Sequence, residues 1–281
     1  MNKLLVFLFV GFFAQLIDGS LGMAYGSTST SLLLTYGVAP AIASSSVHIA
    51  EIVTTGVSGI SHFKLGNVDS KLVFRLIIPG AAGAFTGACF LSRLPGDLIK
   101  PYISILLVIL GIYIVLKYFL NFNWTSAQSR ASNKKLLPLG LIAGFVDSIG
   151  GGGWGTIATP FLLTQPNMSP RKVIGSVDSS EFIVTIASSA GFLLSIGSEQ
   201  INWSWVFILM AGGLLAAPLA AWLVKVLPTQ LLGVFVGGII ILTNTRTIFS
   251  AWQIDKLMLL LIYGLILIVF IALPVTLKLR K

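Results

Sequence analysis

Residues Gly11–Gly26 read GFFAQLIDGSLGMAYG, and residues Gly140–Gly155 read GLIAGFVDSIGGGGWG. Three glycines, one alanine and one aspartate coincide between these two segments at a constant offset of 129 residues. The similarity continues downstream at an offset of 130, where Glu51 matches Glu181. An internal repeat of this kind indicates that the chain consists of two related halves.

Each half opens with two short apolar pieces that flank its glycine-rich break. They cover 4–17 and 27–36 in the first half, and 137–146 and 156–165 in the second half. These pieces fall short of the roughly 20 residues that an upright helix needs to cross a bilayer. Glycine-rich backbone is tolerated inside a membrane only where protein or a water-filled cavity satisfies its polar groups. We therefore expect each pair to form a short helical hairpin, re-entrant or fully spanning, with its tip deep inside the protein.

The composition indicates that the chain is embedded in a membrane. Hydrophobic residues make up 56% of it and charged residues only 10%, whereas a soluble domain carries about 25% charged residues. The sequence predicts an all-α polytopic membrane protein, in which three spans follow each hairpin and one extra span stands at the C-terminal end. The predicted spans are 41–62, 72–92 and 99–119, then 171–193, 203–225 and 228–250, and finally 256–277.

The predicted organisation is a first repeat over 1–120, a cytoplasmic linker over 121–136, a second repeat over 137–250, and a C-terminal helix with a basic tail over 251–281. Because a hairpin returns to its own side, each half crosses the membrane an odd number of times, which inverts the second half. The resulting loops place thirteen of the 18 Lys and Arg residues on one side and five on the other. The positive-inside rule assigns the first side to the cytoplasm. We expect a multi-pass protein of the cell membrane, with its N-terminus outside and its C-terminus inside.

Several function classes are disfavoured. The formal net charge of +9 is also found in nucleic-acid-binding proteins, but the basic residues here are scattered through short loops. No G-x-x-x-x-G-K-[ST] motif occurs, so ATP-driven transport would need another chain. The chain also lacks a nucleophile motif and a metal-ligand cluster in its sequence. The sequence therefore predicts a protein that is not an enzyme and that has no cofactor and no metal site. Its predicted partners are the lipid bilayer and a small molecule.

Five of the nine carboxylates fall in the repeat motifs, at predicted membrane depth: Asp18, Glu51, Asp147, Asp178 and Glu181. Ionisable residues inside a membrane are costly and are functional candidates by default. An alternative interpretation is that Asp18 and Asp147 cap helix ends and stabilise the hairpins.

The predicted helices that carry Glu51 and Glu181 have a polar face. His48 precedes Glu51 by three residues, and Asp178 precedes Glu181 by three, so each pair lies on one side of its helix. Serines stand close by in both halves: Ser44, Ser45, Ser46, Ser176, Ser179 and Ser180. In the functional interpretation these residues line the site, and Glu51, Asp178 and Glu181 couple transport to H⁺ or Na⁺. In the structural alternative, the serine hydroxyls bond back to carbonyls and the glutamates brace the hairpins.

A helix begins after each glycine-rich break, at Ser27 and at Thr156. The free N–H groups and the dipole of a helix start attract anions. No Lys or Arg falls at full predicted membrane depth, so these neutral donors would have to hold the anion. The predicted substrate-binding residues are Tyr25, Gly26, Ser27, Thr28, Ser44, Ser45, Ser46, His48, Gly152, Gly153, Trp154, Thr156, Ser176 and Ser179. Core packing is the alternative role for Tyr25 and Trp154.

The motifs DGSLGMAYG from Asp18 and DSIGGGGWG from Asp147, each followed by a proline and a serine-rich helix with a glutamate, resemble the sulfite exporter TauE/SafE family. The resemblance covers nearly the whole chain. It implies a polytopic permease, mostly of exporter type, for sulfite, sulfoacetate or related sulfonates. The first half reads SLGMAYG where a glycine-richer run is common in the family, which implies two unequal half-sites.

These observations predict a secondary transporter of a small sulfur-containing anion that works by alternating access. A permease or channel for another small anion or a metal ion is the alternative. The choice of sulfur anion, the direction of transport, the coupling ion and the oligomeric state stay open at this point.

Overall fold

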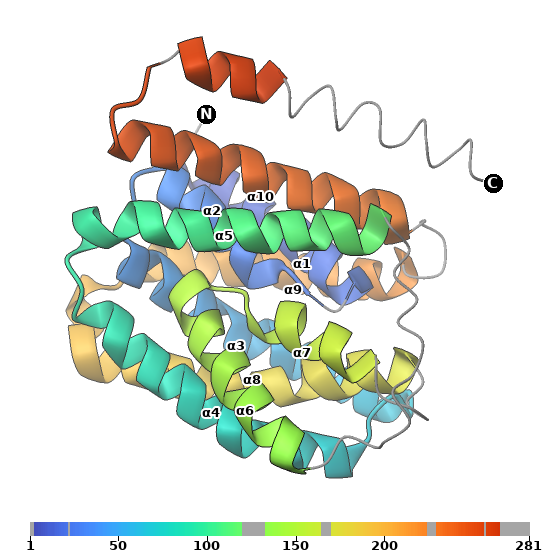
Figure 1. Cartoon of the computed structure of the whole chain (residues 1–281). Coiled ribbons are helices and arrows are strands. Elements are labelled where there is room, and N and C mark those ends of the chain that lie inside the picture. Colours follow the sequence, from blue (N-terminus) through green and yellow to red (C-terminus); the bar gives the residue numbers. More distant parts are fainter. Residues whose placement is uncertain are drawn as a thin grey trace, which may run out of the picture.

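The computed structural model of the chain describes residues 3–21, 23–119, 133–163, 170–223, 229–255 and 257–264. These residues form helices and short connections, with no strand among them (Figure 1). The helices are α1 (Lys3–Leu21), α2 (Tyr25–Thr35), α3 (Pro40–Lys64), α4 (Ser70–Ser92), α5 (Gly96–Phe119), α6 (Asn133–Gly150), α7 (Trp154–Leu163), α8 (Pro170–Ile196), α9 (Trp203–Leu223) and α10 (Thr229–Ala251), with a 3-10 turn, η1 (Ser198–Gln200), before α9. The predicted all-α class is therefore confirmed within the described residues.

The helix boundaries differ from the predicted ones mainly at the hairpins. α1 ends at Leu21 rather than at residue 17, and α6 runs from Asn133 to Gly150 rather than from 137 to 146. The predicted helices ended just before Asp18 and Asp147, because Gly and Ser follow these aspartates in the sequence. One Gly costs a helix only about 1 kcal/mol, and packing in the protein interior outweighs that. α6 also begins inside the predicted linker 121–136, most of which lies outside the described residues.

The longer helices match the predicted spans to within a few residues. Local signals explain several of their starts. Pro40 stands at the first position of α3, where its missing N–H costs nothing. Asp69 caps α4 by accepting hydrogen bonds from the backbone N–H groups of Lys71 and Leu72. The last predicted span, 256–277, lies mostly outside the described residues, and its residues 257–264 are helical.

Close helix pairs in this fold touch at glycines. α4 packs along α6, α1 along α9, and α5 along α10 (Figure 1). A Cβ added at Gly83 would come 2.2 Å from the carbonyl oxygen of Leu141, and one at Gly11 would come 2.3 Å from that of Leu209. Small residues allow such close approach between membrane helices, because dispersion contacts must replace the hydrophobic effect there.

α3 and α8, the serine-rich helices of the two halves, run antiparallel along each other. Gly56 faces Phe182, while Gly175 faces Asn67 beyond the end of α3. The end of α3 therefore lies beside the start of α8.

Polar and apolar side chains are distributed as in a membrane protein. The carboxylates of Asp18 and Asp147 are at most 3% exposed, whereas Phe74 is 67% and Ile78 75% exposed. Aromatic and branched apolar side chains with such large exposed fractions are stable where lipid, and not water, surrounds the protein.

Three helical segments of the described residues are long and apolar enough to cross a membrane: Ser70–Ser92, Gly96–Leu116 and Lys172–Ile196. α3 has 25 residues, enough for a crossing at about 1.5 Å per residue. Its buried serines, His48 and Glu51 lower its apolar character and turn toward the protein centre.

Candidate substrate and coupling site

The two glycine-rich breaks meet in the centre of the molecule. A Cβ added at Gly26 would lie 1.3 Å from the carbonyl oxygen of Gly151, and one at Gly152 would lie 2.2 Å from the backbone nitrogen of Ser27. Gly26 belongs to the first turn of α2, and Gly151 and Gly152 directly precede α7. We call this meeting of Gly26 and Ser27 with Gly151 and Gly152 the tip contact. It brings together the start of α2 and the residues directly before α7.

Asp18 and Asp147 lie in the last turns of α1 and α6, and each accepts hydrogen bonds from the start of the next helix. The Oδ1 atom of Asp18 accepts from the backbone N–H of Tyr25 at 3.4 Å. The Oδ1 atom of Asp147 accepts from the N–H groups of Gly153 and Trp154 at 2.8 and 2.9 Å. The carboxylates therefore join the two arms of each hairpin beside the tip contact.

His48 links the first half to the second. Its Nε2 atom lies 3.1 Å from Oδ2 of Asp147, and both side chains are buried. Its Nδ1 atom lies 2.8 Å from the carbonyl oxygen of Ser44. Both ring nitrogens thus lie within hydrogen-bond distance of an oxygen that can accept, one on the backbone of its own helix and one on the other half of the chain. Ser44 adds a second link, because its hydroxyl donates to the carbonyl oxygen of Ser148 on α6 at 2.5 Å.

Three buried carboxylates lie close together in the protein interior. One oxygen from each of Asp18, Asp178 and Glu181 lies within 4.8 Å of the others, and none of these residues is more than 8% exposed. Asp178 Oδ2 has no hydrogen-bond partner and lies 3.9 Å from Nε2 of the partly exposed His62. The sequence did not predict this group, which we call the carboxylate cluster.

Glu51 is not one of the three residues of the carboxylate cluster, and it borders the tip contact. Its side chain is 3% exposed, and a Cβ added at Gly26 would lie 3.2 Å from its Oε1 atom. The hydroxyl of Thr55 donates to the Glu51 carbonyl at 2.6 Å. α3 thus presents His48 to one aspartate and Glu51 to the glycine backbone, one turn apart.

Most of the predicted hydroxyl donors already use their hydrogen atom. Ser45 and Ser46 donate to the Ile42 carbonyl, and Ser179 donates to that of Gly175. Ser27 donates to the carbonyl of Ala24 and Thr156 to that of Gly152, whereas Ser176 accepts from the N–H of Asp69. The buried hydroxyls of Thr28 and Thr30 have no partner, so α2 retains the free donors nearest the tip contact.

Tyr25 and Trp154 are buried and form hydrogen bonds that bind helices together. The Trp154 indole N–H donates to the carbonyl of Val177 at 3.1 Å and to the hydroxyl of Ser180 at 3.2 Å. The Tyr25 hydroxyl donates to the carbonyl of Leu209 at 3.4 Å. Such contacts are expected if Tyr25 and Trp154 have the alternative role, which is packing in the protein core.

Comparison with known proteins gives the family of this chain. The family model described as "Sulfite exporter TauE/SafE" matches residues 7–247. The chain belongs to the sulfite exporter TauE/SafE family. It is 56% identical over 254 residues to the "Probable membrane transporter protein YtnM" of Bacillus subtilis, covering 90% of this chain and 85% of that protein.

More distant relatives carry similar names. A "Probable membrane transporter protein" of Haemophilus influenzae is 27% identical over 223 residues, with 78% of this chain and 84% of the relative covered. "Probable membrane transporter protein ORF9" of Sinorhizobium sp is 26% identical over 219 residues, with 76% and 80% covered. No solved structure matches the chain significantly. Like its relatives, this TauE/SafE protein is a membrane transporter and not an enzyme.

Sequence reasoning missed several buried polar residues of this TauE/SafE protein. Asn244 on α10 is fully buried and donates from Nδ2 to the hydroxyl of Ser31 on α2 at 2.7 Å. Ser148 donates to the carbonyl of Ala84, and Gln15 leaves its buried Oε1 without a partner. For Asn244 the sequence did offer a signal, because it is an amide inside the apolar run of the predicted span 228–250.

Proposed function

We propose that the protein is a secondary transporter that exports a small sulfur-containing anion, sulfite or an organosulfonate such as sulfoacetate. The description of its family supports the substrate class and the outward direction. The observation that carries the proposal is the tip contact, where two helix starts meet in the protein centre. Helix starts offer free N–H groups and positive dipole ends to an anion.

Two inverted halves would supply the two states that alternating access requires. The antiparallel run of α3 and α8 and the meeting of two hairpin tips support this arrangement. The tips are in backbone contact, so no anion fits between Gly26 and Gly151 in this state. We infer that the anion binds beside the contact, at the free hydroxyls of Thr28 and Thr30, and that the tips separate when the site opens.

The hydroxyls of Thr28 and Thr30 provide a test, because they are buried without partners. Replacing both by Val removes a polar group that makes no bond in the fold, so the melting temperature in detergent should stay the same or rise. A hydrogen bond to a charged group contributes about 1.5–3 kcal/mol, so we expect the KM for the anion to rise at least about tenfold.

Thr86→Val is the matched control for this test, since that partly exposed hydroxyl bonds only to carbonyls of its own helix α4. It should leave the KM unchanged. A Thr28→Val/Thr30→Val variant that is stable and transports with the parent KM would remove these residues from the site.

The carboxylate cluster is the proposed coupling site. At offsets of 129 and 130 residues, Asp147 matches Asp18 and His48 matches Asp178, so the pair His48–Asp147 corresponds to the pair Asp178–Asp18. An imidazole faces the carboxylate in the first pair, whereas a carboxylate faces it in the second, with Glu181 close by. Buried like charges repel strongly. A proton or a sodium ion in the cluster would compensate this repulsion. Cation binding would then be coupled to the conformation of the first hairpin, which carries Asp18.

Flux into liposomes tests the substrate and the coupling together. We expect saturable movement of one anion among sulfite, sulfoacetate, taurine and sulfate, accelerated by an imposed pH or sodium gradient. Asp178→Asn should abolish the response to the gradient while anion movement down its own gradient persists. Glu199→Gln, at an exposed carboxylate in η1, should behave like the parent protein. Absence of flux for all four anions with folded protein would refute the substrate class, and a gradient response retained in Asp178→Asn would refute the coupling site.

One alternative has a specific observation in its favour. The carboxylate cluster has the grouping of a cation site, so a permease for a cation would use the same residues. In the proposed mechanism radioactive sodium, or a proton, moves only when the anion is present. Equal cation uptake with and without a sulfur anion would favour the cation permease.

A further inference from the structure

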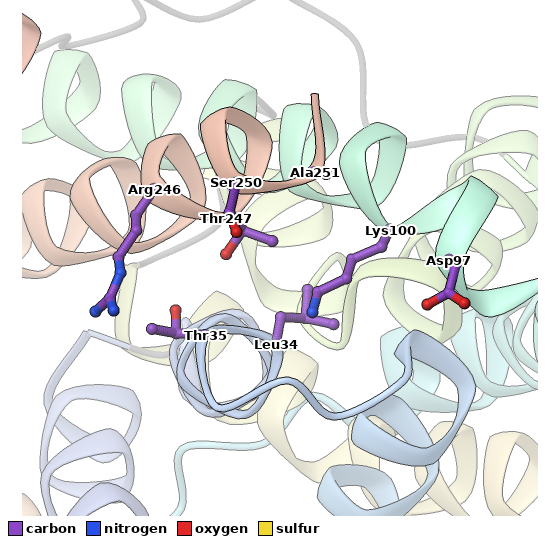
Figure 2. Close-up of a pocket in the computed structure, with 8 residues that line it drawn as sticks. All are labelled: Leu34, Thr35, Asp97, Lys100, Arg246, Thr247, Ser250 and Ala251. Atoms are coloured by element: carbon purple, nitrogen blue, oxygen red, sulfur yellow. The ribbon is translucent and has the colours of Figure 1, made fainter. Parts of the chain in front are cut away.

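A pocket of about 340 Å³ opens at the end of the molecule opposite to the tip of the first hairpin, where α2 and α10 end and α5 begins (Figure 2). It is lined by Leu34, Thr35, Asp97, Lys100, Arg246, Thr247, Ser250 and Ala251. Phe7 near the start of α1 contacts Tyr36 just after α2, with ring centroids 5.7 Å apart. The pocket therefore lies at the end of the protein where the chain begins, which the charge distribution of the sequence predicts to face outward.

The lining of this pocket is positively charged. Lys100 comes from α5 and Arg246 from α10, and Figure 2 shows them on opposite sides, with the hydroxyls of Thr35, Thr247 and Ser250 between them. Asp97 is the single acidic residue in the lining. The ion pairs found in the described part of the chain both involve histidines, so neither Lys100 nor Arg246 has a carboxylate within salt-bridge distance there.

Two features of the pocket would oppose an anion, the carboxylate of Asp97 and the end of α2. The last carbonyls of α2 carry the negative end of its dipole, but those of Leu32, Leu33 and Leu34 accept backbone N–H groups from the following turn. The hydroxyls of Thr35 and Thr247 donate to carbonyls of their own helices. The donors that remain are the two cationic groups and Ser250, which together suit a small oxyanion approached from two sides.

A line of buried polar groups runs from the pocket toward the tip contact. Ser31 lies one turn deeper than Thr35 on α2, and its hydroxyl accepts a hydrogen bond from Asn244 of α10 at 2.7 Å. Deeper still on α2, the hydroxyls of Thr28 and Thr30 are buried without partners, as is Oδ1 of Asn244. Unsatisfied buried groups cost stability, and a passing hydrated anion would give them partners.

We propose that this pocket is a second, outer binding site for a small oxyanion, from which the anion exchanges along α2 and α10 with the tip contact. The inference rests on the proposed anion transport. Fixed cations at the edge of the solution raise the local anion concentration, whereas the same charges at the centre would hold the anion too firmly for transport.

Cysteine modification measures the pocket without requiring transport. Ser250→Cys places a thiol in the pocket, and Cys89→Ala removes the one native cysteine. Purified protein is treated with an anionic reagent, sulfonatoethyl methanethiosulfonate, and with a cationic one, trimethylammonioethyl methanethiosulfonate. Two nearby positive charges should make the anionic reagent faster by roughly fivefold. Taken relative to each reagent's rate with a free thiol, the anionic-to-cationic rate ratio should fall below one in the Lys100→Gln/Arg246→Gln background, where Asp97 is the charge that remains in the lining. It should stay unchanged with Lys64→Gln at the exposed far end of α3.

Protection by ligand completes the test. Millimolar sulfoacetate should slow modification in the protein with both cations, and have no effect once they are replaced by Gln. A rate ratio that is the same with and without Lys100 and Arg246, or an absence of protection, would overturn the outer site. Protection together with failed anion flux in liposomes would instead leave the pocket as an anion site and refute the proposed transport.

Discussion

Gly26→Ala is expected to abolish transport and to lower the free energy of unfolding by several kcal/mol. The new methyl group would lie 1.3 Å from the carbonyl oxygen of Gly151, and 3.2 Å from the Glu51 carboxylate. The first obstacle is backbone held in the opposite hairpin, so no side-chain rotation can relieve it, and forced overpacking costs about 1–3 kcal/mol or more. Unfolding in mixed SDS and detergent micelles, together with anion flux in liposomes, measures both effects.

Gly150→Ala is the matched control, at the last residue of α6 and directly before the same tip. A Cβ there would meet only side-chain carbons of α5, the nearest being Leu106 at 3.5 Å, which is an ordinary van der Waals distance. Ala also has a higher helix propensity than Gly by up to about 1 kcal/mol. We expect parental or slightly greater stability and parental flux. If Gly26→Ala behaved like Gly150→Ala, the tip contact would not exist in the working protein.

Much of the helix order was predictable because it depends on local properties of the chain. A span must be apolar over about 20 residues, and the helices α4, α5, α8, α9 and α10 follow such runs closely. The repeat of the glycine-rich motif also predicted that two hairpins would form. Their ends were less predictable, because Gly and Ser near Asp18 and Asp147 do not stop a helix whose last turn is held by tertiary contacts.

The contacts within the site were harder to predict, because they depend on which helix faces meet. A stretch such as Ser44, Ser45 and Ser46 turns by about 100° per residue, so the three hydroxyls cannot all point into one site. Ser44 reaches Ser148 in the other half, while the other two bond back to their own helix. Spacing placed His48 and Glu51 on one face, but could not show that an aspartate 99 residues away would meet the imidazole.

Asp147→Ala is the second variant with a large expected effect. It removes the acceptor of the N–H groups of Gly153 and Trp154 and the partner of His48, all of them buried. Removing one member of a buried ion pair costs about 3–5 kcal/mol, because the remaining charge loses its compensation. Asp69→Ala is the control: its carboxylate also accepts two backbone N–H groups, at the start of α4, but it is partly exposed and has no imidazole partner among the ion pairs of the described residues. Loss of such a cap costs about 1 kcal/mol.

A double-mutant cycle separates the ion pair from the cap. If His48 and Asp147 stabilise each other, then His48→Ala combined with Asp147→Ala should cost less than the sum of the two single changes, because the double variant buries no unpaired charge. The N–H groups of Gly153 and Trp154 remain without their acceptor in both variants that lack Asp147, so this contribution cancels in the cycle. Additive losses would show that the imidazole and the carboxylate act separately. The inference that the carboxylate cluster needs a cation would then lose its basis, because it rests on the comparison with the His48–Asp147 pair.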